Sequence, residues 1–279
     1  RNQVIGAISC VLTNAQRSYD QSDLELFEEL ARRCAQAVDN ARLFQAAQAA
    51  VRVRDAFLSV AAHELKTPLT TLYGQAQLLQ RRLHQGGVVE ERDVQAISRV
   101  VGQARRLNRM IGDLLDLSRI EAGQLTIMRE RLDVNALVAQ VVEIAQPILA
   151  PQAIEVALLD APLYAAVDAI RFEQVLHNLL SNAVKYSPGG QRVLVSVERQ
   201  NGSVAIAVRD FGIGVPADAM AHLFDRFYRA PNAEQQRISG IGVGLYVVRE
   251  IITLHGGTID VASVEGQGSV FTVKLPVGE

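Results

Sequence analysis

A histidine followed directly by an acid and, soon after, by a proline stands out in the sequence. These residues are His63, Glu64 and Pro68, within an apolar stretch of helical periodicity. Pro68 cannot donate to the carbonyl of Glu64, so we expect the helix to be loosened beside the histidine. A neutral imidazole is a nucleophile near pH 7, and Glu64 can hold the proton on one ring nitrogen while the other attacks phosphorus. An ordinary His-Glu pair on a solvated helix is the alternative interpretation.

Two asparagines and a lysine recur at helical spacing further along the chain. Asn178 and Asn182 are four residues apart, so both amides project from one helix face. Their carbonyl oxygens suit Mg²⁺, which keeps water and phosphate oxygens as its other ligands. Lys185 lies one turn later and can reach phosphate. The alternative interpretation is that these are two polar residues on a solvated helix face without a ligand.

Two glycine-rich segments follow. In Asp210-Phe-Gly212-Ile-Gly214 the carboxylate follows a strand-like run and can accept a hydrogen bond from an exocyclic amine, as on adenine, although a hairpin bend would also fit. The segment 240–245, Gly-Ile-Gly-Val-Gly-Leu, opens an apolar helix, where backbone amides favour a phosphate. It is neither a Walker loop nor a dinucleotide fingerprint.

The elements that would position these residues fall into two parts of the chain with different sequence patterns. Residues 4–13 are rich in β-forming residues and predict a strand, and helical periodicity then runs from Asp20 to Arg82. Gln85-Gly86-Gly87 predicts a turn, and a second helical pattern ends near Gly123. Two long amphipathic helices joined by a short turn form a hairpin, which cannot cover both of its apolar faces alone. We therefore expect two copies to pair into a four-helix bundle, giving a homodimer.

After Gly123 strand-like and helical runs alternate, which predicts a mixed α/β layer domain. The stretch from Gly212 to Gly240 has weak periodicity and is too long for a simple connector, so it is expected to bind something as a lid. The expected strands are 125–130, 153–158, 192–199, 203–209, 257–262 and 269–275, and the expected helices are 134–146, 169–184 and 242–254.

Composition excludes several classes of protein. A formal net charge of −2 gives no reason to expect nucleic acid as a partner, and no apolar run is long enough to span a membrane. Cys10 and Cys34 form no metal or redox pattern and are expected to be small core residues in a reducing, cytoplasmic compartment. Because Arg1 is not a natural start, we expect a piece of a longer protein.

Taken together and in this order, the motifs resemble those of the sensor histidine kinases of two-component systems, over nearly all of residues 50–279. No motif of that family is missing. The matching segments are His63–Pro68 for the H box, Asn178–Pro188 for the N box, Asp210–Gly214 for the G1 box, Leu223–Arg229 for the F box, Gly240–Leu245 for the G2 box and Gly266–Thr272 for the closing strand.

The resemblance implies an α+β chain with a dimerising phosphotransfer hairpin over residues 46–122 and a Bergerat-type α/β sandwich that binds ATP over residues 123–279. It further implies autophosphorylation of His63, transfer of the phosphoryl group to a response-regulator aspartate, and a phosphatase activity. ATP and Mg²⁺ are the implied cofactors, and a receiver domain is the implied partner.

Individual roles follow from the same resemblance. His63 would be the phosphoacceptor with Glu64 as its base, while Thr67 would orient water for dephosphorylating a receiver domain. Arg226 would stabilise the transferring phosphoryl group. The other four histidines match no acceptor motif and are expected to be structural or solvated. The implied nucleotide site comprises Asn182 and Asn178 for Mg²⁺, Asp210 for adenine, and Lys185, Tyr186, Gly212, Gly214, Gly240, Gly242, Gly244, Leu245 and Thr272 around them.

Residues 1–45 resemble the last strand and exit helix of a GAF sensor domain, most closely between Asp23 and Phe44. We expect the helix from Asp23 to about Arg82 to transmit a signal through a change of packing or register.

Three other functions stay open at this point, one of which is a chain that acts mainly as a phosphatase. An ATPase clamp of the gyrase, MutL or Hsp90 type would use the same nucleotide motifs, but would not need the His63 hairpin. A dimeric scaffold with a degenerate nucleotide site would not need Asn182, Asp210 and the glycines intact.

Overall fold

The computed structural model describes residues 4–11, 13, 18–84, 91–149, 154–187, 192–200, 202–236, 238 and 240–277. For residues 46, 49–50, 52–60, 63, 82–84 and 148–149 only the backbone is described. The chain divides into two compact units, residues 1–60 and 61–279, which are taken separately below.

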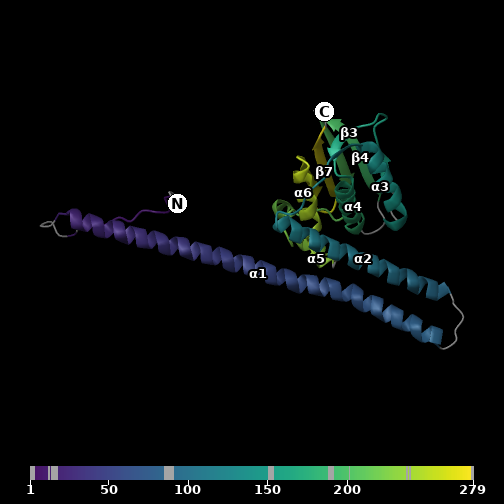
Figure 1. Cartoon of the computed structure of the whole chain (residues 1–279), viewed down its shortest axis with the longest axis horizontal. Helices are drawn as coiled ribbons and strands as arrows, with labels where there is room; N and C mark the ends of the chain where they lie inside the picture. Colours follow the sequence, from purple (N-terminus) through teal and green to yellow (C-terminus); the bar gives the residue numbers. More distant parts are fainter. Residues whose placement is uncertain are drawn as a thin grey trace. The chain divides into compact units, whose positions relative to one another are not determined.

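The secondary structure is an early pair of long helices followed by alternating helices and strands (Figure 1). In chain order the elements are α1 (Gln21–His84), α2 (Glu91–Glu121), β1 (Glu130–Asp133), α3 (Val134–Leu149), β2 (Ile154–Ala157), β3 (Tyr164–Val167), α4 (Ala169–Lys185), β4 (Val193–Gln200), β5 (Ser203–Arg209), the 3-10 helix η1 (Ala217–His222), α5 (Pro231–Gln235), α6 (Gly244–Leu254), β6 (Thr258–Val264) and β7 (Gly268–Pro276).

The first unit consists mainly of the first part of α1. The Asp20 carboxylate accepts hydrogen bonds from the amides of Ser22 and Asp23, at 2.9 and 3.1 Å, which fixes the start of the helix. The expected strand over 4–13 is wrong, since residues 4–11 and 13 are in no strand. A strand is stabilised by a neighbouring strand, and within the described residues none pairs with this segment.

The expectation that the two cysteines are core residues is also wrong. Cys10 and Cys34 are free and exposed. The described residues of this unit pack no core around them: Leu24 is 50% exposed and Phe44 63% exposed. Apolar neighbours in the sequence do not bury a side chain unless a second element packs against it.

The second unit begins with a helical hairpin, as expected. The helix α2 returns along the last part of α1, and Glu64 Oε2 lies 4.0 Å from Arg106 Nη2 across the pair. Helix α1 continues through Pro68, with Thr70 Oγ1 donating to the Lys66 carbonyl at 2.8 Å. The expected turn at 85–87 lies outside the described residues. Ala61 of α1 and Ala96, Met110 and Leu117 of α2 are buried.

The rest of the second unit is a five-stranded sheet with strand order β2-β4-β5-β7-β6, and helices α3, α4 and α6 pack against it (Figure 1). Strands β2 and β4 are parallel and the other neighbours are antiparallel. Val193, Val195 and Val197 alternate toward the buried face of β4, at 0–2% exposure, which is the period of two that a half-buried strand requires. This mixed α/β layer confirms the predicted fold class.

The observed secondary structure differs from the expected one mainly in the short strands and short helices. The strand expected at 125–130 begins at Glu130, where it can pair with β3, and β3 itself was not expected. The segment 212–240 contains η1 and α5, two short helices whose few turns leave little periodicity in the sequence. Among the described residues, no helix combines the length and apolar character that crossing a bilayer requires.

Candidate active site

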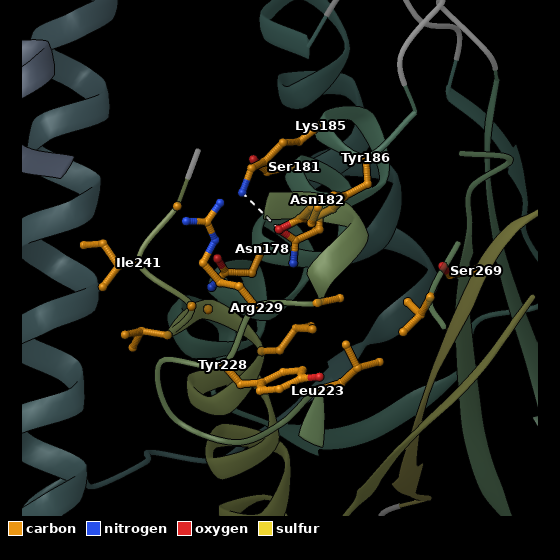
Figure 2. Close-up of a pocket in the computed structure, with 18 of the residues that line it drawn as sticks. Asn178, Ser181, Asn182, Lys185, Tyr186, Leu223, Tyr228, Arg229, Ile241 and Ser269 are labelled. Atoms are coloured by element: carbon orange, nitrogen blue, oxygen red, sulfur yellow. Dashed lines mark hydrogen bonds between the residues drawn. The ribbon is translucent and has the colours of Figure 1, made fainter. Parts of the chain in front are cut away.

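A cavity of about 430 Å³ opens in the second unit, between α4, the residues after β5, the loop before α6 and one face of α2. Figure 2 shows the α4 side chains Asn178, Asn182 and Lys185 on one side of it, with Tyr228 opposite and Ser269 on the strand side. The cavity brings together most of the predicted nucleotide residues: Asn178, Asn182, Lys185, Tyr186, Asp210, Gly214, Gly240, Gly242, Gly244 and Leu245.

Helix α4 presents the two asparagines because its other face is the core. Its start is capped by Asp168, which accepts a hydrogen bond from the Arg171 amide at 3.1 Å. Phe172, Leu176 and Leu179 of the same helix are buried at 0–1% exposure, so the face with Asn178 and Asn182 points to the cavity. Both amides can therefore offer oxygens to a cation or donors to a phosphate.

The Asp210 carboxylate is held at the end of β5. It accepts hydrogen bonds from the amides of Gly212 at 2.9 Å and Ser269 at 3.3 Å. Burial raises the pKa of this carboxyl, while the hydrogen bonds from Gly212 and Ser269 act in the opposite direction. A carboxylate that is buried at 4% exposure and lines a cavity is well placed to accept a hydrogen bond from a ligand donor.

The glycines at 212 and 242 are required by close backbone approaches. A Cβ on Gly212 would lie 2.0 Å from the carbonyl oxygen of Tyr186, and one on Gly242 would lie 2.7 Å from that of Tyr228. Gly242 also has a φ of +78°, which other residues rarely adopt. Gly212 does not line the cavity itself: it lets the segment after β5 rest against the end of α4.

Lys185 lies close to the glycine-rich loop before α6. Its Nζ donates to the Tyr186 hydroxyl at 3.2 Å, and a Cβ on Gly240 would lie only 2.7 Å from that Nζ. The ammonium group therefore sits beside backbone that has no side chain to shield it. A phosphate in the cavity would meet this charge and the adjacent backbone together.

The predicted lid contributes Tyr228, Arg229 and Asn232 to the cavity wall. Arg229 donates to the carbonyl of Ile238, and Asn232 Nδ2 donates to the carbonyl of Gly214 at 3.0 Å. The other amide atom, Asn232 Oδ1, is buried without a hydrogen-bond partner among the described residues. An orphaned buried acceptor in a cavity wall suits a ligand that carries donors.

Some predicted residues lie away from this cavity. Arg226 pairs with Glu121 at the end of α2, and Thr272 lies in β7 opposite Ala207 and Asp260. Glu64 and Thr67 lie on α1 and do not line the cavity, and the His63 side chain lies outside the described atoms. The roles given to these residues stay predictions.

Four residues of α2 line the cavity and were not predicted: Arg106, Arg109, Met110 and Asp113. Burial raises the pKa of Asp113 to about 6, with Arg109 lowering it and Asp116 raising it. Their spacing places them on one helix face, which the sequence does reveal. That this face meets the nucleotide cavity depends on tertiary packing, for which the sequence carries no local signal.

His255 is a structural histidine whose two ring nitrogens both contact backbone atoms. It is buried at 1% exposure, its Nε2 accepts from the Asp168 amide at 2.9 Å, and its Nδ1 lies 2.7 Å from the Ile251 carbonyl. Burial lowers its pKa, so the neutral form with the proton on Nδ1 is favoured. This residue joins the end of α6 to the start of α4 and lies outside the cavity.

Comparison with known proteins agrees with this architecture. Residues 53–123 match the His Kinase A (phospho-acceptor) domain, and residues 167–279 match the histidine kinase-, DNA gyrase B- and HSP90-like ATPase family. The solved structure of the Acinetobacter baumannii histidine kinase AdeS is 30% identical, with a TM-score of 0.56 over 78% of this chain and 98% of that one. Full-length ShkA in complex with AMPPNP is 28% identical, with a TM-score of 0.55 over 80% of this chain and 45% of that one.

Two curated relatives are longer proteins. The circadian input-output histidine kinase CikA of Synechococcus elongatus is 34% identical over 88% of this chain, and the sensor histidine kinase WalK of Bacillus subtilis is 33% identical over 81%. The chain spans 32% and 37% of their respective lengths. It belongs to the sensor histidine kinases of two-component systems and carries their phosphoacceptor and ATP-binding domains.

Proposed function

We propose that this chain transfers the γ-phosphoryl group of ATP to His63 and then to an aspartate of a response-regulator receiver domain. The observation that carries the proposal is the cavity in which the α4 asparagines, Asp210 and the glycine-rich loop meet, in a chain whose α1 contains His63-Glu64. In the first step an imidazole nitrogen forms a bond to the γ-phosphorus, the bond to the bridging oxygen breaks, and ADP leaves. Glu64 holds the proton on the other ring nitrogen.

The cavity fits ATP by the chemistry of its wall. Asp210 offers a buried acceptor for the adenine amine, and Lys185 lies among unshielded backbone where phosphates would bind. Asn182 and Asn178 would hold Mg²⁺, which would neutralise phosphate charge when bound. The AMPPNP complex of ShkA supports a nucleotide at the corresponding domain. Because ATP is the substrate, we place this part of the protein in the cytoplasm.

We also propose a homodimer through the hairpin. On α2 the positions 97, 101, 104, 108, 111 and 115 alternate at spacings of four and three, and all are exposed in the single chain. Ile97, Val101, Ile111 and Leu115 supply 42–55% exposed apolar side chains to this stripe. A heptad stripe of this kind suits a partner helix, as in a four-helix bundle.

For the domain limits we propose 1–45 for the end of a GAF-like sensor domain, 46–122 for the hairpin and 123–279 for the ATP-binding domain. The exposed Leu24, Leu30 and Phe44 of α1 would pack against such a domain or against a partner chain. Insertions near Arg52 would then change kinase activity with heptad periodicity. Activity that is indifferent to insertion length would contradict signalling through this helix.

A phosphatase activity toward the phosphorylated receiver domain is proposed on the pattern Glu64 to Thr67. Thr67 is exposed one turn beyond Glu64 on α1, where its hydroxyl could orient a water molecule. Thr67→Ala should slow dephosphorylation of a purified phospho-receiver domain while His63 still becomes phosphorylated. Equal loss of both activities would contradict a separate role for Thr67.

The kinase proposal is tested by incubating the protein with Mg²⁺ and γ-labelled ATP, beside Asn182→Ala. Label that is lost in acid and stable in base, and absent from the Asn182 variant, is the expected result. ATP hydrolysis without labelled protein would favour the ATPase clamp instead. Nucleotide binding with neither label nor hydrolysis would favour the scaffold.

A further inference from the structure

We infer that Asn232 of α5 is a second acceptor for the amine of the nucleobase, beside Asp210, and that it helps the site to select adenine. The inference rests on the proposed function, because it names a further specificity residue of the same nucleotide site. It starts from a buried amide oxygen that has no donor among the described residues.

The orientation of the Asn232 amide is fixed by a backbone carbonyl. Asn232 Nδ2 donates to the carbonyl oxygen of Gly214 at 3.0 Å. A carbonyl oxygen can only accept, so the amide atom that faces it is the nitrogen, and Oδ1 points away from it. That oxygen is buried and lacks a hydrogen-bond partner within the described part of the chain. A buried acceptor without a donor is unfavourable, and a donor on a bound ligand would remove that cost.

Helix α5 is held against the rest of the site, which keeps this oxygen from turning out to solvent. Ala230 and Ala233, close to Asn232 in the sequence, are buried and line the same cavity. The Ala233 amide donates to the Ala230 carbonyl at 3.0 Å, and the Ala233 carbonyl accepts from the Ile238 amide at 3.0 Å. The acceptor is therefore in place in the cavity wall before a ligand binds.

One end of the cavity suits phosphates and another suits a base. A Cβ on Gly240 would lie 2.7 Å from Lys185 Nζ, so this positive charge lies at the loop before α6. Asn232 is instead bonded to Gly214, four residues after Asp210 in the segment that follows β5. A carboxylate at that end repels phosphate. We therefore assign the Asn232 oxygen to the base and not to the phosphates.

A chain of hydrogen bonds ties the segment after β5 to the Asp210 carboxylate. The Val215 amide donates to Ser263 Oγ at 2.9 Å, and Ser263 Oγ lies 2.9 Å from Ser269 Oγ. The Ser269 amide in turn donates to Asp210 Oδ1 at 3.3 Å. The carbonyl that anchors the α5 amide is thus held in a fixed position relative to the carboxylate.

The exocyclic amine of adenine can serve two acceptors, because it carries two N–H groups. Asp210 can accept from one and Asn232 Oδ1 from the other. A base with a carbonyl at this position, such as guanine or hypoxanthine, would place its oxygen against both acceptors. Asn232 would thus add to the selectivity that Asp210 provides.

The preference for the amine tests this assignment. It is measured by calorimetry, with Mg²⁺ present, as the dissociation constant of purine riboside 5′-diphosphate, which lacks the amine, divided by that of ADP. Asn232→Ala should lower this ratio about three- to tenfold, the scale of one neutral hydrogen bond. Gln235→Ala is the matched control and should leave the ratio unchanged, because it removes an amide from an exposed position of α5 that does not line the cavity.

Asn232→Asp separates the acceptor from the anchor. It keeps an oxygen acceptor and loses the N–H group that binds the Gly214 carbonyl. We expect this variant to keep the wild-type ratio even where both affinities fall. A ratio lowered as far as in Asn232→Ala would overturn the inference, because the preference would then depend on the anchor alone.

Other results would also overturn the inference. An equal loss of affinity for both ligands in Asn232→Ala would show that the residue only holds Gly214 in place. An effect that disappears with 2′-deoxy- or 3′-deoxy-ADP, and persists with the deaminated analogue, would assign the oxygen to the ribose. Wild-type chain that does not bind ADP would overturn the proposed function and this inference with it, whereas ADP binding with an unchanged ratio would overturn the inference alone.

Discussion

Arg171 Nη1 of α4 lies 2.9 Å from Asp116 Oδ1 of α2, and Gln174 Nε2 donates to the other Asp116 oxygen at 2.7 Å. Both oxygens of one buried carboxylate thus join the hairpin helix to the helix that carries the asparagines. The side chains of Asp116 and Arg171 are only 10% and 19% exposed, so this contact is shielded from water. The relationship explains how α2 comes to form one wall of the nucleotide cavity.

Removing this carboxylate should loosen the junction. We expect Asp116→Ala to lower the free energy of unfolding by about 2–4 kcal/mol, because Arg171 is left with an uncompensated, largely buried charge. Arg119→Ala is the control: its guanidinium is 56% exposed and 4.0 Å from Asp116, so the loss should stay under about 1 kcal/mol. Chemical denaturation measures both. Equal, small losses would show that the junction does not stabilise the fold.

The close approach at Gly212 makes a steric prediction. Gly212→Ala should lower stability by about 2–4 kcal/mol and weaken nucleotide binding, because its Cβ would meet the Tyr186 carbonyl at 2.0 Å. Gly266→Ala should cost only about 1 kcal/mol, since Gly266 has a φ of +78° but no atom within 4 Å of the added Cβ. Thermal unfolding and nucleotide titration of both variants separate the two effects. A Gly212 variant that binds nucleotide normally would contradict the assigned packing.

Asp113 predicts a pH dependence of stability. Its pKa is raised by burial from 3.8 to about 6, so between these pH values the folded chain holds more protons than the unfolded chain. The stabilisation from its protonated form is complete below about pH 4 and is lost as pH rises through about 6. Asp113→Asn should therefore gain about 1–3 kcal/mol relative to wild type on going from pH 4 to pH 8. A difference in unfolding free energy that does not vary with pH would contradict a perturbed Asp113.

The exposed stripe on α2 predicts the effect of a charge at the dimer interface. Ile111→Glu should raise the dimer dissociation constant by a factor on the order of a hundred or more, because an unpaired carboxylate would be buried between the chains. Gln95→Glu places the same carboxylate at an exposed α2 position outside the stripe and should leave the dimer intact. Sedimentation velocity distinguishes the two forms. Equal dimer dissociation constants in the two variants would show that the dimer interface does not include this stripe.

Much of the site could be predicted because its residues are dictated locally. Asn178 and Asn182 share a helix face by spacing alone, and the strands and helices around them were expected within a few residues of their observed ends. Gly212 and Gly242 stand in the sequence because no larger side chain fits there. Local geometry of this kind restricts the residue types that a position can hold, so the sequence alone indicates it.

What could not be predicted depends on contacts between distant segments. Arg106 and Asp113 line the cavity where α2 packs against later parts of the chain, and one of these contacts joins Asp116 to Arg171, 55 residues away in the sequence. Strand β3 exists through its pairing with β1, and neither is long enough to show a pattern of its own. The strand expected at 4–13 had the right composition, but no strand within the described residues pairs with it.

In the proposed reaction His63 is the one histidine that receives the phosphoryl group. The most direct measurement is peptide mapping by mass spectrometry, at alkaline pH to preserve phosphohistidine, after incubation with Mg²⁺ and ATP. We expect phosphorylation of His63 alone among the five histidines of the chain, and none in the His63→Gln variant. Phosphate on His84, His177, His222 or His255, or an unmodified protein that has consumed the ATP, would contradict it.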